Sequence, residues 1–266
     1  MNRSFVATAC ISAALLTGCF STVKSTVKLD QKKIETLEDF DYTSWNTLLV
    51  THVNDQGQVD YPALMADRKP LDEFVAIIGE VGPTTRPKLF DTRDKKLSFY
   101  INAYNALTMF NVINRLPAMK TVMDDDKDFF YFTEFQVDGK PISLYKLENE
   151  LIRPTFNEPR IHFALNCASA GCPVLPAEAF VPEKLEAQLE RETQKFLREP
   201  RNVSVDGKQM VTLSKIFEWY AVDFPPSAVE WIRQKAPDLT LPVSSEAAPM
   251  KITHRPYDWA LNAQKR

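Results

Sequence analysis

LSFYINAYNALTMFNVINRL, residues 97–116, is apolar around nearly the whole circumference of a helix. A helix that is apolar on one side lies at the surface of a domain, whereas one that is apolar all round is buried in its interior. The stretch therefore predicts a central helix that other elements cover on all sides. Asn102 and Asn105 share one face of this helix, while Asn111 and Asn114 fall on roughly the opposite face. Only the first pair can line a single site.

Shorter patterns on both sides of this stretch predict further helices and strands. The expected helices cover residues 70–79, 144–153, 183–198 and 228–235, and the expected strands cover residues 129–137 and 160–167. A turn is expected at residues 54–57, and residues 203–207 predict a hairpin. The order lacks the strand–helix alternation of parallel βαβ units, so it predicts an α+β class. We expect a single domain in which the buried central helix packs against a mixed or antiparallel sheet.

The N-terminus has the pattern of a bacterial lipoprotein. Arg3 precedes an apolar run at residues 5–15, and residues 16–19 read LTGC, a small-residue cleavage pattern that ends in cysteine. The run is too short to span a bilayer. The sequence therefore predicts a lipoprotein signal peptide at residues 1–18, acylation such as palmitate on Cys19, a lipidated tether at residues 19–38 and one domain at residues 39–266. A simple secretory signal is the alternative.

This N-terminus predicts a lipid-anchored protein of the cell envelope. Two or three acyl chains on Cys19 would anchor it firmly to the membrane, because a single chain gives only marginal binding. In a cell with two membranes, Phe20 after the lipidated cysteine resembles the pattern sorted to the periplasmic face of the outer membrane. The expected partners are the membrane itself and an envelope protein, peptide or small-molecule ligand.

Composition argues against several other classes of function. Lysine and arginine total 32 against 35 aspartate and glutamate, which predicts no nucleic-acid partner. The seven glycines include no G-x-G or G-K-[ST] pattern, so no phosphate-binding loop and no cofactor are expected. Asp124, Asp126 and Asp128 have the spacing of a calcium loop, but Phe129 and Phe135 stand where that loop needs glycine and glutamate. No metal site is predicted.

Several stretches together resemble the domain of unknown function 547 family. They are YINAYNAL at residues 100–107, RIHFALNCAS at 160–169 running into Cys172 and Pro173, LSKIFEWY at 213–220 with Asp223 and Phe224, and YDW at 257–259. These stretches span about residues 45–262 in the expected order. The family has no agreed activity, so the resemblance implies kinship more than function.

A buried helix followed by strands also resembles the papain and transglutaminase group. In that group the helix N-terminus presents a nucleophilic cysteine and a later strand carries a histidine. His162 would suit the second role, but the helix here offers Asn102 and Asn105 and no cysteine. The likeness is one of fold alone.

Two cysteines dominate the question of function. Cys10 leaves with the signal and Cys19 is acylated, so Cys167 and Cys172 remain. In an oxidising compartment they can form a disulfide that pins their loop. The alternatives are a catalytic or redox thiol at Cys167, which needs activation because a free thiol is mostly protonated at neutral pH, or two inert buried thiols.

The candidate site lies around these cysteines. On a strand at residues 160–167, His162 and Asn166 would face one way and Cys167 the other, so the base for Cys167 would be His52 or His254. Glu148 is a candidate acid or base, or could orient His162.

The small residues at 168–171 favour a pocket near Asn166 and Ser169, because they let backbone amides approach a ligand. Asn102 and Asn105 are candidate binding residues, with hydrogen bonds to neighbouring backbone carbonyls as the simpler interpretation. The aromatic residues Trp219, Tyr220, Phe224 and Trp259 are expected in the core, with a stacking platform as the alternative.

Two hypotheses of function follow. The first is a ligand- or partner-binding lipoprotein whose loop is closed by a disulfide between Cys167 and Cys172 and whose pocket contains His162, Asn166 and Asn102. The alternative is a cysteine-dependent acyl-transfer hydrolase of amidase or peptidase type, with Cys167 as nucleophile and a histidine as base. Thiol–disulfide exchange is less favoured, because the spacing C-x4-C departs from C-x-x-C. Whether the protein is an enzyme stays open at this point.

Overall fold

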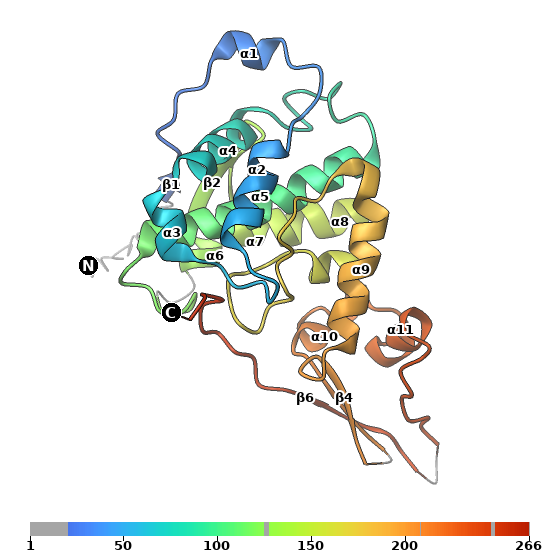
Figure 1. Cartoon of the computed structure of the whole chain (residues 1–266). Helices are drawn as coiled ribbons and strands as arrows, with labels where there is room; N and C mark the ends of the chain where they lie inside the picture. Colours follow the sequence, from blue (N-terminus) through green and yellow to red (C-terminus); the bar gives the residue numbers. More distant parts are fainter. Residues whose placement is uncertain (1–20, 125–127, 208, 246–247, 266) are drawn as a thin grey trace, which may run out of the picture.

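The computed structural model describes residues 21–124, 128–207, 209–245 and 248–265 (Figure 1). Its elements in chain order are β1 (Ser21–Val23), α1 (Gln31–Glu35), α2 (Thr43–His52), α3 (Tyr61–Ala66), α4 (Lys69–Glu80), α5 (Arg93–Arg115), α6 (Asp128–Tyr131), β2 (Thr133–Val137), β3 (Lys140–Ser143), α7 (Leu144–Lys146), the π-helix η1 (Leu147–Ile152), α8 (Arg153–Phe156), the 3₁₀-helix η2 (Pro159–Phe163), the 3₁₀-helix η3 (Pro182–Lys184), α9 (Leu185–Arg198), β4 (Val203–Asp206), β5 (Met210–Leu213), α10 (Ile216–Trp219), the 3₁₀-helix η4 (Ala221–Asp223), α11 (Ala228–Lys235) and β6 (Lys251–His254). Among these described helices, none is both long enough and apolar enough to cross a membrane.

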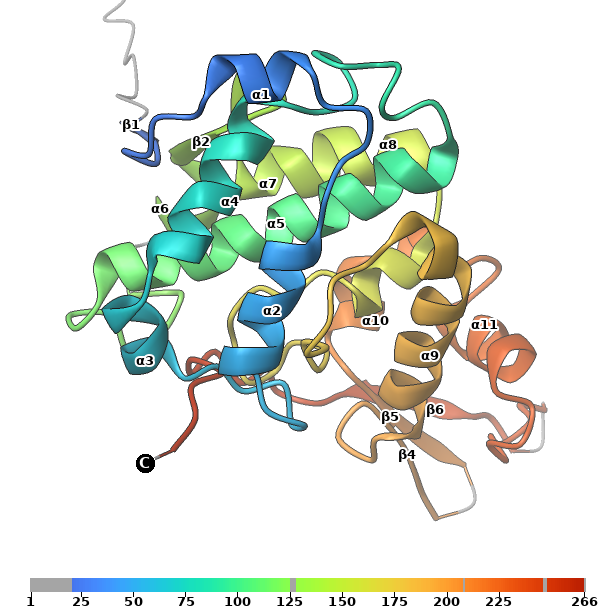
Figure 2. The ribbon, with the colours of Figure 1, turned by 45° about the horizontal axis from the view of Figure 1, so that its top comes forward.

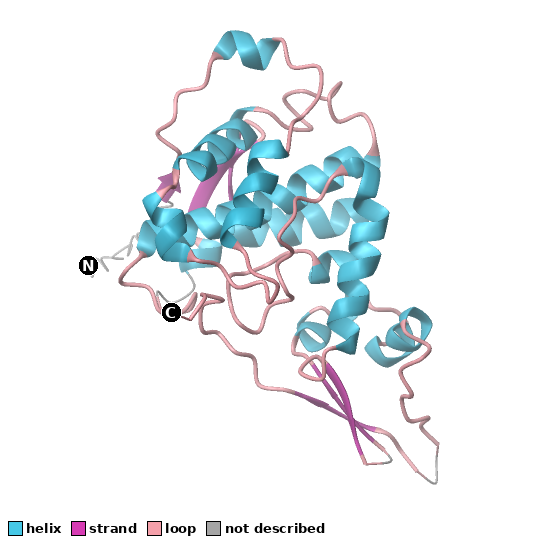
Figure 3. Cartoon of the chain, viewed as in Figure 1, coloured by secondary structure: helices cyan, strands magenta, loops and turns pink. Residues whose placement is uncertain are grey.

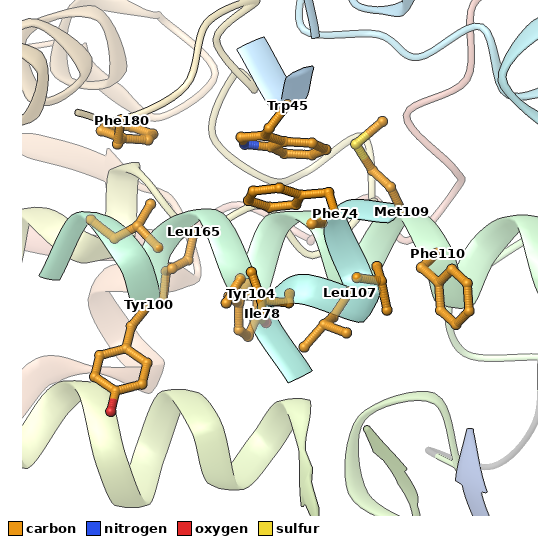
Figure 4. Close-up of a cluster of buried hydrophobic side chains, with 14 of the residues drawn as sticks. Trp45, Phe74, Ile78, Tyr100, Tyr104, Leu107, Met109, Phe110, Leu165 and Phe180 are labelled. Atoms are coloured by element: carbon orange, nitrogen blue, oxygen red, sulfur yellow. The ribbon is translucent and has the colours of Figure 1, made fainter. Parts of the chain in front are cut away.

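Helix α5 is the buried central helix that the sequence predicts. Every residue from 97 to 113 is buried, and α2 and α4 lie on one side of the helix while α7 and α8 run along another (Figures 1 and 2). Above α5, the indole of Trp45 stacks on the ring of Phe74, with centroids 5.1 Å apart and planes 7° apart (Figure 4). Thr92 caps the helix by accepting a hydrogen bond from the backbone N–H of Lys95.

Two three-stranded sheets flank the helices, and both are mixed (Figure 3). In the first, β2 pairs in parallel with β1 and antiparallel with β3. In the second, β5 pairs antiparallel with β4 and in parallel with β6. The α+β class, the single domain and the hairpin predicted from residues 203–207 are confirmed, with β4 and β5 as the two strands of the hairpin.

The buried side chains form two clusters. The larger one surrounds α5 and takes residues from most of the chain up to α9. The second is built on aromatic rings of the C-terminal third, with Phe163 as its contribution from η2. The ring of Phe163 lies 4.5 Å from that of Phe196 and 5.8 Å from that of Trp231, distances at which aromatic pairs attract.

Residues 160–167 do not form the predicted strand. They begin as the 3₁₀-helix η2, which Glu158 caps by accepting from the backbone N–H of Arg160, and continue as turns. Pro159 fits the first turn of a helix because it has no N–H to leave without a partner. The strand prediction was wrong because a short apolar run that is buried on all sides carries no period that separates strand from helix.

Other predicted elements are confirmed with shifted bounds. Helices α4, α9 and α11 match the predictions at residues 70–79, 183–198 and 228–235. Residues 129–137 start as helix α6, so only their second half is a strand. The helix predicted at residues 144–153 contains the π-helix η1 and runs past Pro154 to Phe156.

Part of the predicted tether packs onto the domain. Strand β1 pairs with β2, Val23 and Leu29 pack against the larger cluster, and Ile34 of α1 is buried in it. The folded region therefore begins before residue 39. The predicted signal peptide, the acylation of Cys19 and Phe20 lie outside the described residues.

The C-terminal residues return from β6 to the N-terminal half of the molecule (Figures 1 and 2). Isolated bridges join Ala263 to Val59, Ala260 to Thr121 and Leu261 to Ser169. Asn262 donates its backbone N–H to the carbonyl of Ala168, and its side chain accepts from the hydroxyl of Tyr61 at 2.7 Å. The last residues thus connect α3 to the loop that carries the two cysteines.

Candidate functional site

A cleft of about 550 Å³ opens between the central helix and the C-terminal third of the chain. Most of its wall is aromatic or apolar, and few charged groups reach it. Its lining residues are Tyr104, Met123, Phe130, Tyr131, Tyr145, Glu148, Asn149, Arg153, His162, Leu165, Cys167, Cys172, Pro173, Ile216, Trp219, Tyr220, Tyr257 and Trp259. A concave, largely apolar wall with a few convergent polar groups is the usual form of a ligand site.

His162 is a polar group of the cleft wall, and Asp223, which is not itself a lining residue, binds it. The Nε2 atom of the buried His162 lies 2.6 Å from Oδ2 of Asp223, and the imidazole stacks on Tyr220 with centroids 4.0 Å apart. Nε of Arg153 donates to the same Asp223 oxygen at 2.7 Å. Burial alone would raise the pKa of Asp223, but the hydrogen bonds from His162 and Arg153 outweigh it and lower this pKa to about 2.

Glu148 is the acidic side chain among the lining residues, and it comes from the π-helix η1. Glu148 is buried, with 8% of the residue exposed to solvent. Burial raises the pKa of the Tyr104 and Tyr220 hydroxyls, and the nearby charge of Glu148 raises both further. The carboxylate therefore faces these two phenols. Single π-turns inside helices occur frequently at functional sites.

Cys167 and Cys172 form a disulfide, as predicted, with a Cα–Cα distance of 6.2 Å. Both cysteines line the cleft, so the bridge is part of its wall. Arg201 holds the same loop from behind by donating to the carbonyls of Ala170 and Cys172. In this oxidised state Cys167 has no thiolate to offer as a nucleophile.

Ser169 and Tyr257 border the disulfide. The Ser169 hydroxyl lies 3.0 Å from Sγ of Cys167, and the Tyr257 hydroxyl lies 3.3 Å from Sγ of each cysteine. Burial raises the pKa of Tyr257, whereas its hydrogen bond with Ser169 opposes that rise. The hydroxyls of these residues therefore pack against the bridge, and Tyr257 also lines the cleft.

The asparagines predicted as binding residues are used inside the fold. Asn102 donates to the carbonyls of Ser98 and Phe180 and accepts from Trp45, and Asn105 donates to the carbonyl of Ala164. These hydrogen bonds to backbone carbonyls are the ones that the simpler interpretation of the two asparagines predicted. Asn102 also accepts a hydrogen bond from the indole of Trp45.

Asn166 has the same kind of role. Its backbone N–H donates to Asn105, and its side chain donates to the carbonyl of Pro173 and accepts from the N–H of Ala168. The structure thus brings Glu148, His162 and Cys167 together at the cleft. It places Asn102, Asn105, Asn166 and Ser169 behind the wall.

The histidines expected as alternative bases lie elsewhere. His52 is on α2, and His254 is on β6 with Nδ1 3.7 Å from the carboxylate of Glu218. Neither residue lines the cleft. The expected opposition of His162 and Cys167 across a strand was also wrong, since no strand forms there and both side chains reach the same cleft.

Sequence reasoning missed Arg153 and Asp223 as site residues. Asp223 stood in a stretch that resembled the family but received no role. Trp219, expected in the core, is 45% exposed, and its ring lies 5.5 Å from Trp259 and 4.8 Å from Tyr257. These three rings line the cleft, so Trp219 does not lie in the core, whereas Phe224 is a core residue as expected. The stacking platform stays a prediction.

The segment that carries Glu148, His162 and the disulfide is similar to a known protein family. Residues 88–197 match the family model described as "Protein of unknown function, DUF547". The match supports the predicted kinship, and we call these residues the DUF547 segment. The three rings at residues 219, 257 and 259 line the cleft and lie beyond this segment, so the cleft is built from the segment and the C-terminal third together. Comparisons with curated proteins and with solved structures returned no match.

Proposed function

We propose that this protein is a cell-envelope lipoprotein that binds a small molecule or a peptide in its aromatic cleft. The observation that carries the proposal is the position of the Cys167–Cys172 disulfide in the cleft wall. The bridge ties the loop into a fixed shape, and it occupies the sulfur that cysteine catalysis would require. A wall fixed in advance reduces the entropy that ligand binding would otherwise lose.

The envelope location rests on the N-terminal sequence and on the redox chemistry. LTGC at residues 16–19 has the cleavage pattern of a lipoprotein. Disulfides persist in the oxidising compartments to which such a signal leads. Acylation of Cys19 would then hold the domain at the membrane, with the periplasmic face of the outer membrane as the proposed site.

The proposed binding can be tested by filling the cleft. Met123 is a half-buried lining residue, so Met123→Trp places an indole in the cleft with little disturbance of the core. Val50 on α2 is 62% exposed and lines none of the described pockets, so Val50→Trp is the matched control. Each variant would be made in a chain that carries Cys19→Ser and is exported to an oxidising compartment.

The immobilised proteins would be incubated with the small-molecule and peptide fraction of a cell envelope, and the retained compounds identified by mass spectrometry. We expect a compound that the Cys19→Ser chain and Val50→Trp both retain and that Met123→Trp does not. Retention of the same compounds by all three proteins would overturn the proposal.

The acyl-transfer alternative has one observation in its favour. Cys167 and His162 line the same cleft, and His162 is already bonded to an aspartate. Reduction of the disulfide would be needed before Cys167 could attack a carbonyl. This alternative predicts rapid, pH-dependent alkylation of Cys167 in the reduced protein, with an apparent pKa well below about 8.5. Slow alkylation of the reduced protein would exclude it.

A further inference from the structure

We infer that the ligand of this cleft carries an alkylammonium group, which Glu148 and the surrounding aromatic rings bind. The inference rests on the proposed binding function and adds the chemical class of the ligand. It comes from one buried carboxylate and from the groups around it.

Glu148 is a buried acidic side chain that forms no ion pair with another described residue. It is 8% exposed and lines the cleft. The Tyr104 and Tyr220 hydroxyls interact with its carboxylate through hydrogen bonds, and Arg153, five positions further along the same helical stretch, interacts with its charge without forming an ion pair. Hydrogen bonds lower the cost of holding a carboxylate away from water but do not neutralise its charge. A cationic ligand group would supply the opposite charge.

Arg153, the cation that the charge of Glu148 acts on, already has other partners. Nε of Arg153 binds Asp223, its Nη1 donates to Asn149 at 2.7 Å, and its guanidinium carbon lies 4.9 Å from the centroid of the Tyr220 ring. The charges of Arg153 and Asp223 cancel each other. Glu148 is the acidic side chain among the residues that line the cleft.

The surroundings of this carboxylate are aromatic. Its charge acts on Tyr104, Tyr131, Tyr220 and Tyr257, all of which line the cleft, and in each it adds to the rise in pKa that burial causes. Aromatic ring faces attract cations, and a set of rings around an ammonium is a general way to bind one. Rings and a carboxylate in one cleft thus favour the same kind of ligand group.

Other ligand charges fit less well. An anionic group would be repelled by Glu148 and would find Arg153 already bonded to Asp223. A bare metal ion would need several oxygen or nitrogen ligands, and among the described residues no group of three or more acidic, histidine or cysteine side chains is placed to hold one. An organic cation needs only the carboxylate and the rings.

The test compares a cation with its neutral isostere. Choline and 3,3-dimethyl-1-butanol have the same shape and differ by the charge on the central atom. Isothermal titration calorimetry of each probe would be carried out on the Cys19→Ser chain and on two variants of it. Glu148→Gln removes the charge and keeps the shape, while Glu150→Gln makes the same change at an exposed residue of the same π-helix.

We expect the Cys19→Ser chain to bind choline at least about tenfold more tightly than the neutral alcohol. The alcohol binds less tightly because it lacks the favourable charge interaction with Glu148. Glu148→Gln should reduce this preference to near unity, and Glu150→Gln should retain it. Equal binding of the two probes, a preference that survives Glu148→Gln, or no binding of choline would each overturn the inference. The retention experiment with Met123→Trp decides the proposed binding function separately, because it does not depend on the charge of the ligand.

Discussion

The imidazole of His162 donates a hydrogen bond from Nε2 to Oδ2 of Asp223 at 2.6 Å. The direction follows because the pKa of Asp223 is about 2, so its ionised carboxylate can only accept at neutral pH. His162 belongs to the DUF547 segment and Asp223 lies beyond it. The next residue, Phe163, enters the second hydrophobic cluster, so η2 directs one side chain to the cleft and the next to the core.

Replacement of Asp223 should change how stability depends on pH. The folded state lowers the pKa of this carboxyl from 3.8 to about 2, so it binds the acidic proton less tightly than the unfolded state does. The resulting stabilisation is complete above about pH 4 and is lost as the pH falls towards about 2. In urea denaturation at a series of pH values, we expect the free energy of unfolding of the parent to fall more steeply over this interval than that of Asp223→Asn.

Asp206→Asn is the control for this series, since Asp206 is an exposed residue of β4. Its pH profile should run parallel to that of the parent. A profile of Asp223→Asn that also runs parallel to the parent between pH 4 and 2 would contradict the assigned role of the pair.

The disulfide should be measurable both as mass and as stability. The intact mass of the Cys19→Ser chain should rise by about two daltons on reduction, with no alkylation of Cys167 or Cys172 before reductant is added. Because the bridge closes a short loop, Cys167→Ala with Cys172→Ala should lower the free energy of unfolding by about 2 kcal/mol. Reductant should destabilise the parent and leave this double variant unchanged; equal effects on both would count against the bridge.

Asn102 should prove to be a structural residue. Asn102→Ala leaves the indole N–H of Trp45 and the backbone N–H of Phe180 without their acceptor inside the core. We expect a loss of about 3 kcal/mol or more in the free energy of unfolding, since each unsatisfied buried group costs about 1–3 kcal/mol. Asn114→Ala, at an exposed position of the same helix, should change it by less than about 0.5 kcal/mol. Similar values for the two variants would show that the buried bonds do not matter.

Gly57 and Gly207 allow the cost of a positive φ to be distinguished from the cost of a steric clash. Gly57 and Gly207 have φ values of +70° and +66°, but an added Cβ at Gly57 would lie 2.5 Å from the backbone N of Leu175, whereas at Gly207 it would meet nothing within 4 Å. Gly207→Ala should therefore cost only the conformational energy, about 1–2 kcal/mol. Gly57→Ala should lower the free energy of unfolding, measured by chemical denaturation, clearly more than Gly207→Ala does. Equal losses would mean that the backbone at Leu175 shifts without cost to make room for the added Cβ.

Acylation should depend on Cys19 alone. Cells that express the chain should incorporate labelled palmitate into it, and the protein should partition into the detergent phase in Triton X-114 extraction. Cys19→Ser should abolish both results, because a chain without its acyl groups has no membrane anchor. Cys10→Ser, which alters the cysteine inside the predicted signal peptide, should leave the labelling and the partitioning unchanged. Labelling that survives Cys19→Ser would refute the lipoprotein assignment.

The central helix could be predicted from sequence because the property that buries it is local. Residues 97–113 are buried on every face, as their all-round apolar pattern requires. The same property hid the conformation of residues 160–167, since an apolar run without a period fits a buried strand and a buried helical turn equally well. Capping by Glu158 and the position of Pro159 decided in favour of the 3₁₀-helix.

The candidate site was predictable only in part. The disulfide could be predicted because the sequence itself contains the predicted export signal, which leads to an oxidising compartment, and the close spacing of Cys167 and Cys172. Asp223 became a site residue only because the fold brings it to His162 across 61 positions of the chain. Glu148 was a candidate from its residue type, but its burial could not be predicted, because it lies in a π-turn at residues 147–152 that the sequence pattern did not indicate.

Asn262 bonds to Tyr61, to Asn166 and to the backbone of Ala168, close to the end of the chain. A polypeptide is synthesised from its N-terminus, so the cysteine loop lacks these contacts until the segment around Asn262 has left the ribosome and packed against it. Asn166 and Asn262 lie 96 positions apart. The wall of the cleft is therefore completed late in synthesis, long after the central helix has been made.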